Sequence, residues 1–372
     1  MIYIVVFLLS CFLANSANKR YGNRKFGFCF YSILAIAFPV LLAGLRDYSI
    51  GTDTLAYVTI FHAACDSNSL VEFFLTYPSV EKGYMFISYL VSRISSNPSV
   101  MLSVNHALII VPLYIACFRM RDNLNPVLSL FIFFFFFYNE SLNLTRQYIS
   151  MAFIILAATY IIDNRIKPYI VLSIIAFLFH STALLGLLWL VFLLTATRFP
   201  FKGHIIVYSL MIFALAYVML NLEDLGLLSS LGDDMSEKFG HYITGGASTM
   251  SLSNSTFIVY LYTLLIVLLC TLGTQLNDKA LDAFVVMALL ALSTVFLSTI
   301  ARALYRLSLI FSMFATLSIP YIWHKYIKTC STKQYNLLRM LVYGFFALVV
   351  VYWVFAFVVV GSNDTYPYLM NQ

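Results

Sequence analysis

The sequence has little charge. Of its 372 residues only 10% are charged, while 62% are hydrophobic. Soluble domains carry about 25% charged and about 45–50% apolar residues. A chain of this length has no use for so much apolar surface in a soluble core, so an ordinary soluble protein is excluded. Lipid solvates a helix that is apolar all round, and the composition therefore predicts an integral membrane protein.

The chain also lacks the features that divide multidomain proteins. It contains no charge run, low-complexity tract or Pro/Gly-rich linker, which favours a single transmembrane domain over residues 1–372. No strong internal repeat is visible, and this weakens the case for a transporter built from inverted repeats.

Cysteine and histidine form no metal-binding or disulfide pattern. Six cysteines are scattered without CxxC spacing and without a nearby histidine pair, so we expect neither a metal site nor a disulfide framework. No cofactor is expected. The net charge of +6 does not indicate nucleic acid, because a basic cytoplasmic face of a membrane protein accounts for it.

Apolar runs follow one another along the whole chain. A full span takes about 20 residues, so several runs need flanking residues to reach that length. The stretch 168–196 has no charge, and we interpret it as a tight hairpin that turns near residues 180–182. We expect an all-α, polytopic fold of about 12 transmembrane helices. The runs are 2–14, 28–45, 99–118, 124–139, 147–162, 168–180, 182–196, 204–221, 256–273, 283–299, 303–323 and 340–361.

Basic residues indicate the orientation. The first run has none before it and Lys19, Arg20, Arg24 and Lys25 after it, unlike a secretory signal, so we expect an uncleaved anchor whose N-terminus lies outside. With that start, the loops assigned to the cytoplasm hold 15 of the 22 Lys and Arg but only four of the 16 acids. This is the positive-inside bias, and it predicts that both termini are extracytoplasmic.

Two of the segments expected outside are long. Residues 46–98 contain a weakly apolar stretch at 84–94 that is too short to span, and we expect it to form an interfacial or re-entrant helix. Residues 222–255 start acidic and end rich in Gly, Ser and Thr, which is typical of an extracytoplasmic surface loop.

Four arginines lie at the outer ends of helices, where the positive-inside bias disfavours them. Arg46 follows the second run and Arg146 opens the fifth, while Arg302 and Arg306 share one face at the start of the eleventh. Arginine at the hydrocarbon boundary is costly unless it is paired or faces a cavity. Its planar fork binds phosphate, so these arginines are candidates to hold a lipid diphosphate. The alternative is that each one snorkels and anchors a helix end.

Nearby polar residues are candidates for proton transfer or substrate positioning. Asp53 lies in the turn-like stretch Gly-Thr-Asp-Thr, Glu81 precedes Lys-Gly-Tyr, and Glu140 comes shortly before Arg146. Each carboxylate is a candidate general base toward a sugar hydroxyl, or alternatively an ion-pair partner or helix cap. His180 is a further candidate, because histidine as a residue type titrates near neutral pH and can move protons; the alternative is a hydrogen-bonded core residue.

These residues resemble, in order along the chain, the motifs of the EpsG-like polysaccharide polymerases. Residues 46–54, with Tyr57 after them, resemble the first signature of that family, and residues 81–84 resemble the next motif. Residues 143–147 are similar to its N-x-x-R-Q helix start, although Ile149 and Ser150 intervene where the family often has alanine.

The resemblance continues toward the C-terminus. Residues 179–183 resemble the F-H-x-[ST]-A element of the family, while 302–306 and 366–368 match weaker features. The family includes lipopolysaccharide O-antigen and capsule polymerases of the Wzy type. The resemblance thus implies a multi-pass glycosyltransferase of the bacterial cytoplasmic (inner) membrane, with its active site facing the periplasm or exterior.

In such an enzyme a growing glycan leaves undecaprenyl diphosphate and joins the sugar of a lipid-linked repeat unit. No metal is required, because the diphosphate is already an adequate leaving group. The implied partners are the undecaprenyl-diphosphate-linked donor and acceptor, membrane lipids and a chain-length regulator protein. The implied site has three groups of residues: Asp53, Glu140 and His180 as catalytic groups; Arg46, Arg146, Arg302 and Arg306 on the diphosphate; and Glu81, Tyr84, Asn143 and Gln147 positioning the substrate.

Two other functions remain open from the sequence. A lipid-linked oligosaccharide flippase or other transporter would need polar residues at mid-membrane, whereas the charges here gather at one level. A surface glycan ligase or acyltransferase is the second alternative, and an acyltransferase would usually depend on a prominent His or His-Asp pair, for which the chain offers His180.

Overall fold

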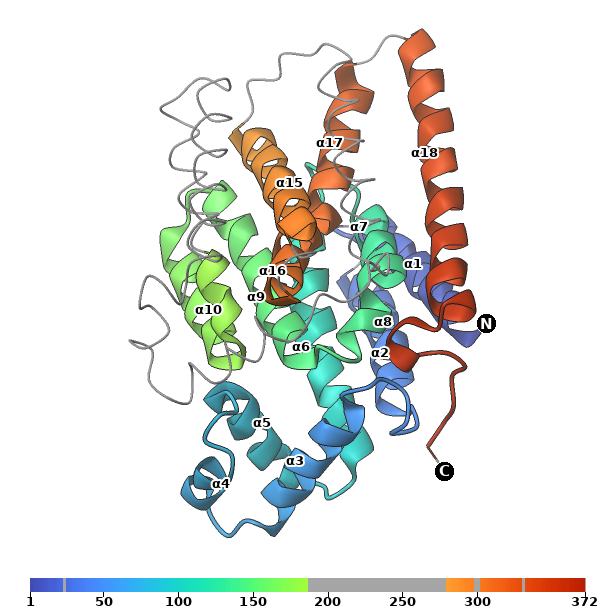
Figure 1. Ribbon diagram of the computed structural model, residues 1–372. Helices are drawn as coiled ribbons and strands as arrows, with labels where there is room; N and C mark the ends of the chain where they lie inside the picture. Colours follow the sequence, from blue (N-terminus) through green and yellow to red (C-terminus); the bar gives the residue numbers. More distant parts are fainter. Residues whose placement is uncertain (23–24, 187–278, 298–301, 330–331, 372) are drawn as a thin grey trace. The chain divides into compact units, whose positions relative to one another are not determined.

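The computed structural model of the chain describes residues 1–22, 25–186, 279–297, 302–329 and 332–371. Regular structure in these residues is helical, apart from one isolated antiparallel bridge between Arg46 and Met370 (Figure 1). By its internal contacts the chain divides into two compact units, Met1–Leu184 with Ile319–Gln372, and Leu185–Ser318. The single transmembrane domain expected from the sequence stays a prediction.

Four described helices are long and apolar enough to cross a membrane. They are α1 (Ile2–Arg20), α2 (Lys25–Gly44), α6 (Pro98–Arg119) and α9 (Thr145–Ile162). The helix α1 packs against α2, α2 against α6, and α6 against α9. These four agree with predicted apolar runs, whereas the total of about 12 spans stays a prediction.

Shorter apolar helices complete the larger unit. The run at 124–139 becomes α7 (Pro126–Ile132), a π-helix (Phe133–Phe137) and α8 (Tyr138–Ser141). The helix α10 (Ile166–Phe179) ends where the hairpin is predicted, and a 3₁₀ turn (Ser181–Leu185) follows His180. The last run becomes α18 (Thr332–Trp353), which continues into a second π-helix (Val354–Val359).

Three helices occupy the long segment 46–98. The helix α5 (Lys82–Ser92) agrees with the helix predicted near 84–94. The helices α3 (Thr54–Asp66) and α4 (Leu70–Thr76) are not among those predicted from the sequence. The buried residues of α3 lie at positions 54, 57, 58, 60, 61 and 64. Each of them is three or four residues from another, a helical period that was available in the sequence.

One apolar run that was predicted to form a single continuous helix forms two helices, so that prediction is wrong. The run 303–323 divides into α16 (Arg302–Met313) and α17 (Ala315–Thr329), which follow α15 (Lys279–Leu297). The hydroxyl of Thr316 donates to the carbonyl of Met313 at 2.7 Å, and the Leu317 N–H bonds instead to Phe314. Because the side chain competes for a carbonyl that a continuous helix would use, the helix breaks there. The runs 204–221 and 256–273, most of 182–196, and the loop 222–255 lie outside the described residues.

Helix ends in the larger unit meet in the way the predicted topology requires. Arg119 pairs with Asp163, and the Arg121 guanidinium lies 3.3 Å from the ring centre of Tyr21, so three predicted cytoplasmic ends are in contact. At an end predicted outside, the Tyr3 hydroxyl donates to the Thr365 carbonyl at 2.9 Å. The helix directions therefore alternate as expected, while the side of the membrane that each end faces stays a prediction.

Gly83 allows α5 to approach the end of α10 closely. A Cβ atom at this position would lie 2.6 Å from the carbonyl oxygen of Leu178 and 2.8 Å from its Cβ. Backbone atoms cannot move aside as a flexible side chain can. The first turn of α5 and the residues that precede His180 are thus brought together by the absence of a side chain.

We expect Gly83→Ala to lower the free energy of unfolding by about 1–3 kcal/mol, because an added methyl group overpacks this contact. Thermal unfolding of the detergent-purified protein measures the change. Gly344→Ala is the matched control, since a Cβ at Gly344 on α18 meets nothing within 4 Å, and alanine there favours the helix. Equal melting temperatures for both variants would contradict the close packing.

Candidate functional site

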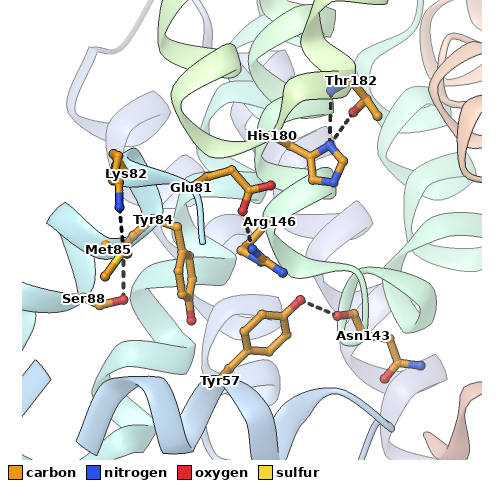
Figure 2. A network of polar contacts seen from close by, with 10 residues as sticks. All are labelled: Tyr57, Glu81, Lys82, Tyr84, Met85, Ser88, Asn143, Arg146, His180 and Thr182. Carbon is orange, nitrogen blue, oxygen red and sulfur yellow. Dashed lines mark hydrogen bonds and ion pairs between the residues drawn. The ribbon is translucent and has the colours of Figure 1, made fainter. Parts of the chain in front are cut away.

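An ion pair between Arg146 and Glu81 joins two motifs that are far apart in the chain (Figure 2). Arg146 lies in the first turn of α9, and Glu81 is the residue before α5. Both side chains are partly exposed, at 29% and 24%. The guanidinium has several N–H donors, and Glu81 engages only one of its nitrogens. The pair holds the first turn of α9 next to the residue that precedes α5.

Two buried tyrosines lie beside this pair. The rings of Tyr57 and Tyr84 have centres 5.7 Å apart, and the Arg146 guanidinium lies 5.9 Å from the Tyr84 ring centre. The Tyr57 hydroxyl donates to the carbonyl of Asn143 at 2.7 Å. Burial raises the pKa of the Tyr57 phenol, and the positive charge of Arg146 opposes that shift. Tyr57 consequently stays protonated at neutral pH and keeps this hydrogen bond.

The first motif forms a tight turn against Asn143. Gly51 has a φ of +88°, and a Cβ there would lie 2.5 Å from the side-chain oxygen of Asn143. Both facts require glycine. Asp53 follows at the N-cap position of α3 and is partly exposed, and its carboxylate makes no capping bond. The turn thus presents a carboxylate next to the start of the Arg146 helix.

Arg46 is completely buried, in contrast to Arg146. Its guanidinium donates to the carbonyls of Ala43 (2.6 Å) and Leu142 (3.2 Å) and to the Thr54 hydroxyl (3.2 Å). These bonds tie the end of α2 to the start of α3 and to the segment before α9. The predicted contact of Arg46 with a diphosphate is untested, but in this conformation its bonds go to the protein.

Other predicted site residues are buried around this centre. Glu140 is only 1% exposed and accepts a hydrogen bond from the Tyr148 hydroxyl at 3.0 Å. Tyr84, Asn143 and Gln147 are buried as well. Their predicted roles in catalysis and substrate positioning stay predictions, and the residues that reach the surface here are Asp53, Glu81, Arg146 and His180.

His180 lies just beyond the last residue of α10. Its Nδ1 accepts the backbone N–H of Thr182 at 3.2 Å and lies 2.7 Å from the Thr182 hydroxyl. The Ser150 hydroxyl, one turn after Arg146, donates to the His180 carbonyl at 3.5 Å. Together with the contact between Gly83 and Leu178, this places the imidazole next to the Arg146–Glu81 pair, as Figure 2 shows.

Arg302 and Arg306 belong to the other compact unit. The helix α16 begins at Arg302, and Arg306 is partly buried. A shared diphosphate site with Arg146 therefore stays a prediction. Within the described residues, no group of three or more His, Cys, Asp and Glu is placed to hold a metal ion.

The C-terminal segment after α18 packs onto this site, which the sequence did not predict. Four hydrogen bonds join it to motif residues and to the adjacent Leu45: Asp47 N to Leu369 O at 2.9 Å, Gly51 N to Asp364 O at 3.0 Å, Asn371 N to Leu45 O at 3.0 Å, and Asn143 Nδ2 to Asn363 O at 3.2 Å. Gly361, Asn363 and Asp364 all have positive φ. The Gly-Ser-Asn-Asp run after the last apolar stretch was a turn signal in the sequence, but it carried no information on what the turn contacts.

Asn139 anchors the same segment from inside the protein. Its Nδ2 donates to the Thr365 hydroxyl at 3.0 Å, and its Oδ1 accepts the indole N–H of Trp353 at 2.9 Å. All three residues are buried. Asn139 immediately precedes Glu140, so the network links the C-terminal segment to the chain that leads to Arg146.

Thr365→Val removes the hydroxyl that accepts the hydrogen bond from Asn139, while the shape of the side chain stays nearly the same. We expect a loss of about 1–3 kcal/mol in unfolding free energy, because a buried amide donor is left unpaired. Thr365→Ser keeps the hydroxyl and should lose clearly less. Thermal unfolding of both purified variants measures the difference, and a serine variant as unstable as the valine variant would show that the hydroxyl contributes nothing.

Comparison with known proteins gives one match. No curated protein and no solved structure matches the chain significantly. The model of the EpsG family, a Wzy-like polymerase-type family, matches residues 29–370. Because this match covers nearly the whole chain and includes the residues of the site described above, the protein belongs to the EpsG family.

Proposed function

We propose that the protein is a polysaccharide polymerase of the Wzy type. It transfers a growing O-antigen or capsule glycan from undecaprenyl diphosphate to a lipid-linked repeat unit at the outer face of the bacterial cytoplasmic membrane. Membership in the EpsG family supports a glycan polymerase at a coarse level. The carrier lipid and the side of the membrane are part of the proposal.

The observation that carries this proposal is the partly exposed Arg146–Glu81 pair at the end of an apolar helix. Charged residues near the membrane-spanning region are rare and commonly mark functional sites. Guanidinium binds phosphate through parallel hydrogen bonds. A lipid diphosphate has its charge at headgroup level and its tail among the helices, which suits an arginine at this position.

The reaction needs one proton acceptor and stabilisation of the leaving diphosphate. The acceptor hydroxyl oxygen attacks the anomeric carbon, and the bond from that carbon to the diphosphate oxygen breaks. The electron pair stays on undecaprenyl diphosphate, where Arg146 stabilises the developing charge. The proton of the hydroxyl passes to a carboxylate. A single displacement of this kind inverts the anomeric carbon.

Among the candidates for that carboxylate, the geometry favours Asp53. It is partly exposed at the Gly51 turn, whereas Glu81 is paired with Arg146 and Glu140 is buried against Tyr148. We assign to Glu140 a positioning role at the start of the Arg146 segment. Glu81 orients Arg146, and Tyr84 and Asn143 support the two motifs from within the protein.

The other predicted arginines have different parts in the proposal. Arg46 positions the motif turn through its three protein acceptors. Arg302 and Arg306 are proposed, from the sequence, to complete the diphosphate site. Exposed apolar side chains on α2, such as Ile33 at 65%, suit contact with lipid tails. A chain-length regulator is proposed as a protein partner on family grounds alone.

A flippase or transporter is the main alternative function. It would need polar groups along a path through the bilayer. The four described helices that are able to span carry their charged residues at or near their ends. This distribution favours a site at one surface over a transport path, and it is equally unfavourable for a channel.

We expect Arg146→Ala to reduce polymerisation by roughly 10²- to 10³-fold, the usual effect of removing a donor to a developing anion. Arg146→Lys should restore little, because lysine lacks the fork. The measurement is glycan chain length in a deletion strain complemented with each variant at equal membrane levels. Long chains of normal distribution from both variants would refute the diphosphate site.

The charge-reversed double variant Glu81→Arg with Arg146→Glu is a control for a purely structural ion pair. If the pair only held α5 to α9, the reversed pair would restore chain length. We expect no restoration, because the arginine that binds the phosphate would then lie at position 81, before α5, and not in α9.

Lipid-linked glycans in the deletion strain distinguish the polymerase from the flippase. Single repeat units on the outer face indicate loss of a polymerase, and units trapped inside indicate loss of a flippase.

A further inference from the structure

Tyr57 joins the two sides of the candidate site. It lies one helical turn after Asp53 in α3, and its backbone N–H donates to the Asp53 carbonyl at 3.2 Å. Its hydroxyl donates to the carbonyl of Asn143 at 2.7 Å. Asn143 comes shortly before Arg146, in the segment that leads into α9. A single side chain thus links the segment of the proposed base to the segment of the proposed diphosphate ligand.

The direction of the Tyr57 hydrogen bond is fixed by its acceptor. A backbone carbonyl can only accept, so the Tyr57 hydroxyl is the donor. Tyr57 is only 5% exposed, and its hydroxyl hydrogen is directed at the protein and not at a substrate. The contribution of Tyr57 to the site is therefore geometric.

Charges from both sides of the site act on the Tyr57 phenol. Burial raises its pKa, the positive charge of Arg146 opposes that shift, and the negative charge of Asp53 adds to it. The ring centre of Tyr84, from α5, lies 5.7 Å from that of Tyr57. In Figure 2 the Tyr57 hydroxyl lies between the Arg146 guanidinium and the Asn143 carbonyl. The phenol is consequently close to both charged groups.

The start of α3 and the segment before α9 are joined at a second point. Arg46 donates to the Thr54 hydroxyl in the first segment and to the Leu142 carbonyl in the other. Two segments that are joined at one point can rotate about it, whereas the additional bond from Tyr57 to Asn143 removes that rotation. The relative orientation of the starts of α3 and α9 is therefore fixed.

We propose that Tyr57 is a positioning residue of the polymerase, which holds the Asp53 carboxylate and the Arg146 guanidinium at a fixed separation on the two sides of the reacting carbon. This inference rests on the proposed function. In a single displacement the acceptor hydroxyl attacks from the side opposite to the leaving diphosphate, so the base and the diphosphate ligand need a defined separation. Tyr57 acts through these two residues and not on the substrate itself.

Tyr57→Phe removes the hydroxyl and keeps the ring. We expect the rate of chain elongation to fall roughly 10- to 100-fold, because a misplacement of about 1 Å at a reacting centre has effects of that size. The rate is measured by pulse labelling of the glycan in the complemented deletion strain, at equal membrane levels. A wild-type rate for Tyr57→Phe would overturn the proposal.

Tyr114→Phe is the matched control. Tyr114 is buried near the end of α6 that is predicted to be cytoplasmic, and its hydroxyl donates to the Ser32 hydroxyl on α2 at 2.8 Å. Because each variant loses one buried hydrogen bond, we expect similar falls in melting temperature for both, but a normal elongation rate for Tyr114→Phe. An equal loss of rate in both variants would show that reduced stability explains the effect, and the proposal would fail.

The double variant Tyr57→Phe with Arg146→Lys tests whether Tyr57 acts through Arg146. We expect its elongation rate to lie within about 2-fold of that of Arg146→Lys alone, since residues that act as a unit have non-additive effects. Two losses that multiply would show that Tyr57 contributes independently of Arg146, which contradicts a positioning role.

If Tyr57→Phe does not accumulate, a fluorinated tyrosine at position 57 provides a second test. Fluorine lowers the pKa of the phenol while the ring and the hydroxyl remain. Ionisation removes the hydrogen that is donated to Asn143, so elongation in isolated membranes should fall at a lower pH than in the wild type. Identical pH profiles would refute the positioning role.

The Arg146 variants separate failure of this inference from failure of the proposed function. If Arg146→Ala abolishes long chains while Tyr57→Phe elongates at the wild-type rate, the polymerase stands and the role of Tyr57 is wrong. If Arg146→Ala and Arg146→Lys both make normal chains, the proposed function is wrong for this site, and the inference fails with it.

Discussion

The buried guanidinium of Arg46 is the interaction on which the rest of the site depends. A charge away from water costs several kcal/mol unless its donors are satisfied. The carbonyls of Ala43 and Leu142 and the hydroxyl of Thr54 must therefore converge on one point. These acceptors come from the end of α2, the start of α3 and the segment before α9. Once they are held together, the turn at residues 50–53 and the start of the Arg146 helix have little freedom left.

Arg46 and Arg146 show how burial gives different roles to two residues of the same type. Arg46 and Arg146 both lie at helix ends in motif sequences, and both are candidates for phosphate binding when only the sequence is considered. The structure buries Arg46 completely and leaves the Arg146 side chain 29% exposed. The two terminal nitrogens of the Arg46 guanidinium bond to protein acceptors, although its Nε has none, and in this way Arg46 organises the protein. Arg146 is paired with Glu81 at a partly exposed position, which suits the contact with a ligand that is proposed for it.

Glycine explains how short motifs from distant parts of the chain come into contact. Gly51 meets the side chain of Asn143, and Gly83 meets the backbone of Leu178. Each glycine lies within two residues of a carboxylate of the candidate site, Asp53 or Glu81. The motifs therefore contain both the carboxylates of the candidate site and the glycines that let neighbouring segments approach closely. The C-terminal segment adds further contacts, since its carbonyls accept hydrogen bonds from the backbone N–H groups of Asp47 and Gly51 and from Nδ2 of Asn143.

The sequence by itself determined the membrane-protein class, the apolar helices, the turn at His180 and the membership in an EpsG-like family, because hydropathy, charge bias and short motifs are local properties. It contained the period of α3, although sequence analysis did not use it. Only the tertiary structure decided that Arg146 pairs with Glu81, that Arg46 is buried, that α16 and α17 are separate and that the C-terminal segment closes the site. Most of these outcomes depend on which donors and acceptors meet across a long stretch of chain, as between Glu81 and Arg146, which are 65 residues apart. The break between α16 and α17 depends instead on competition for one carbonyl, at Thr316. Such choices follow from packing in three dimensions, which no local pattern encodes.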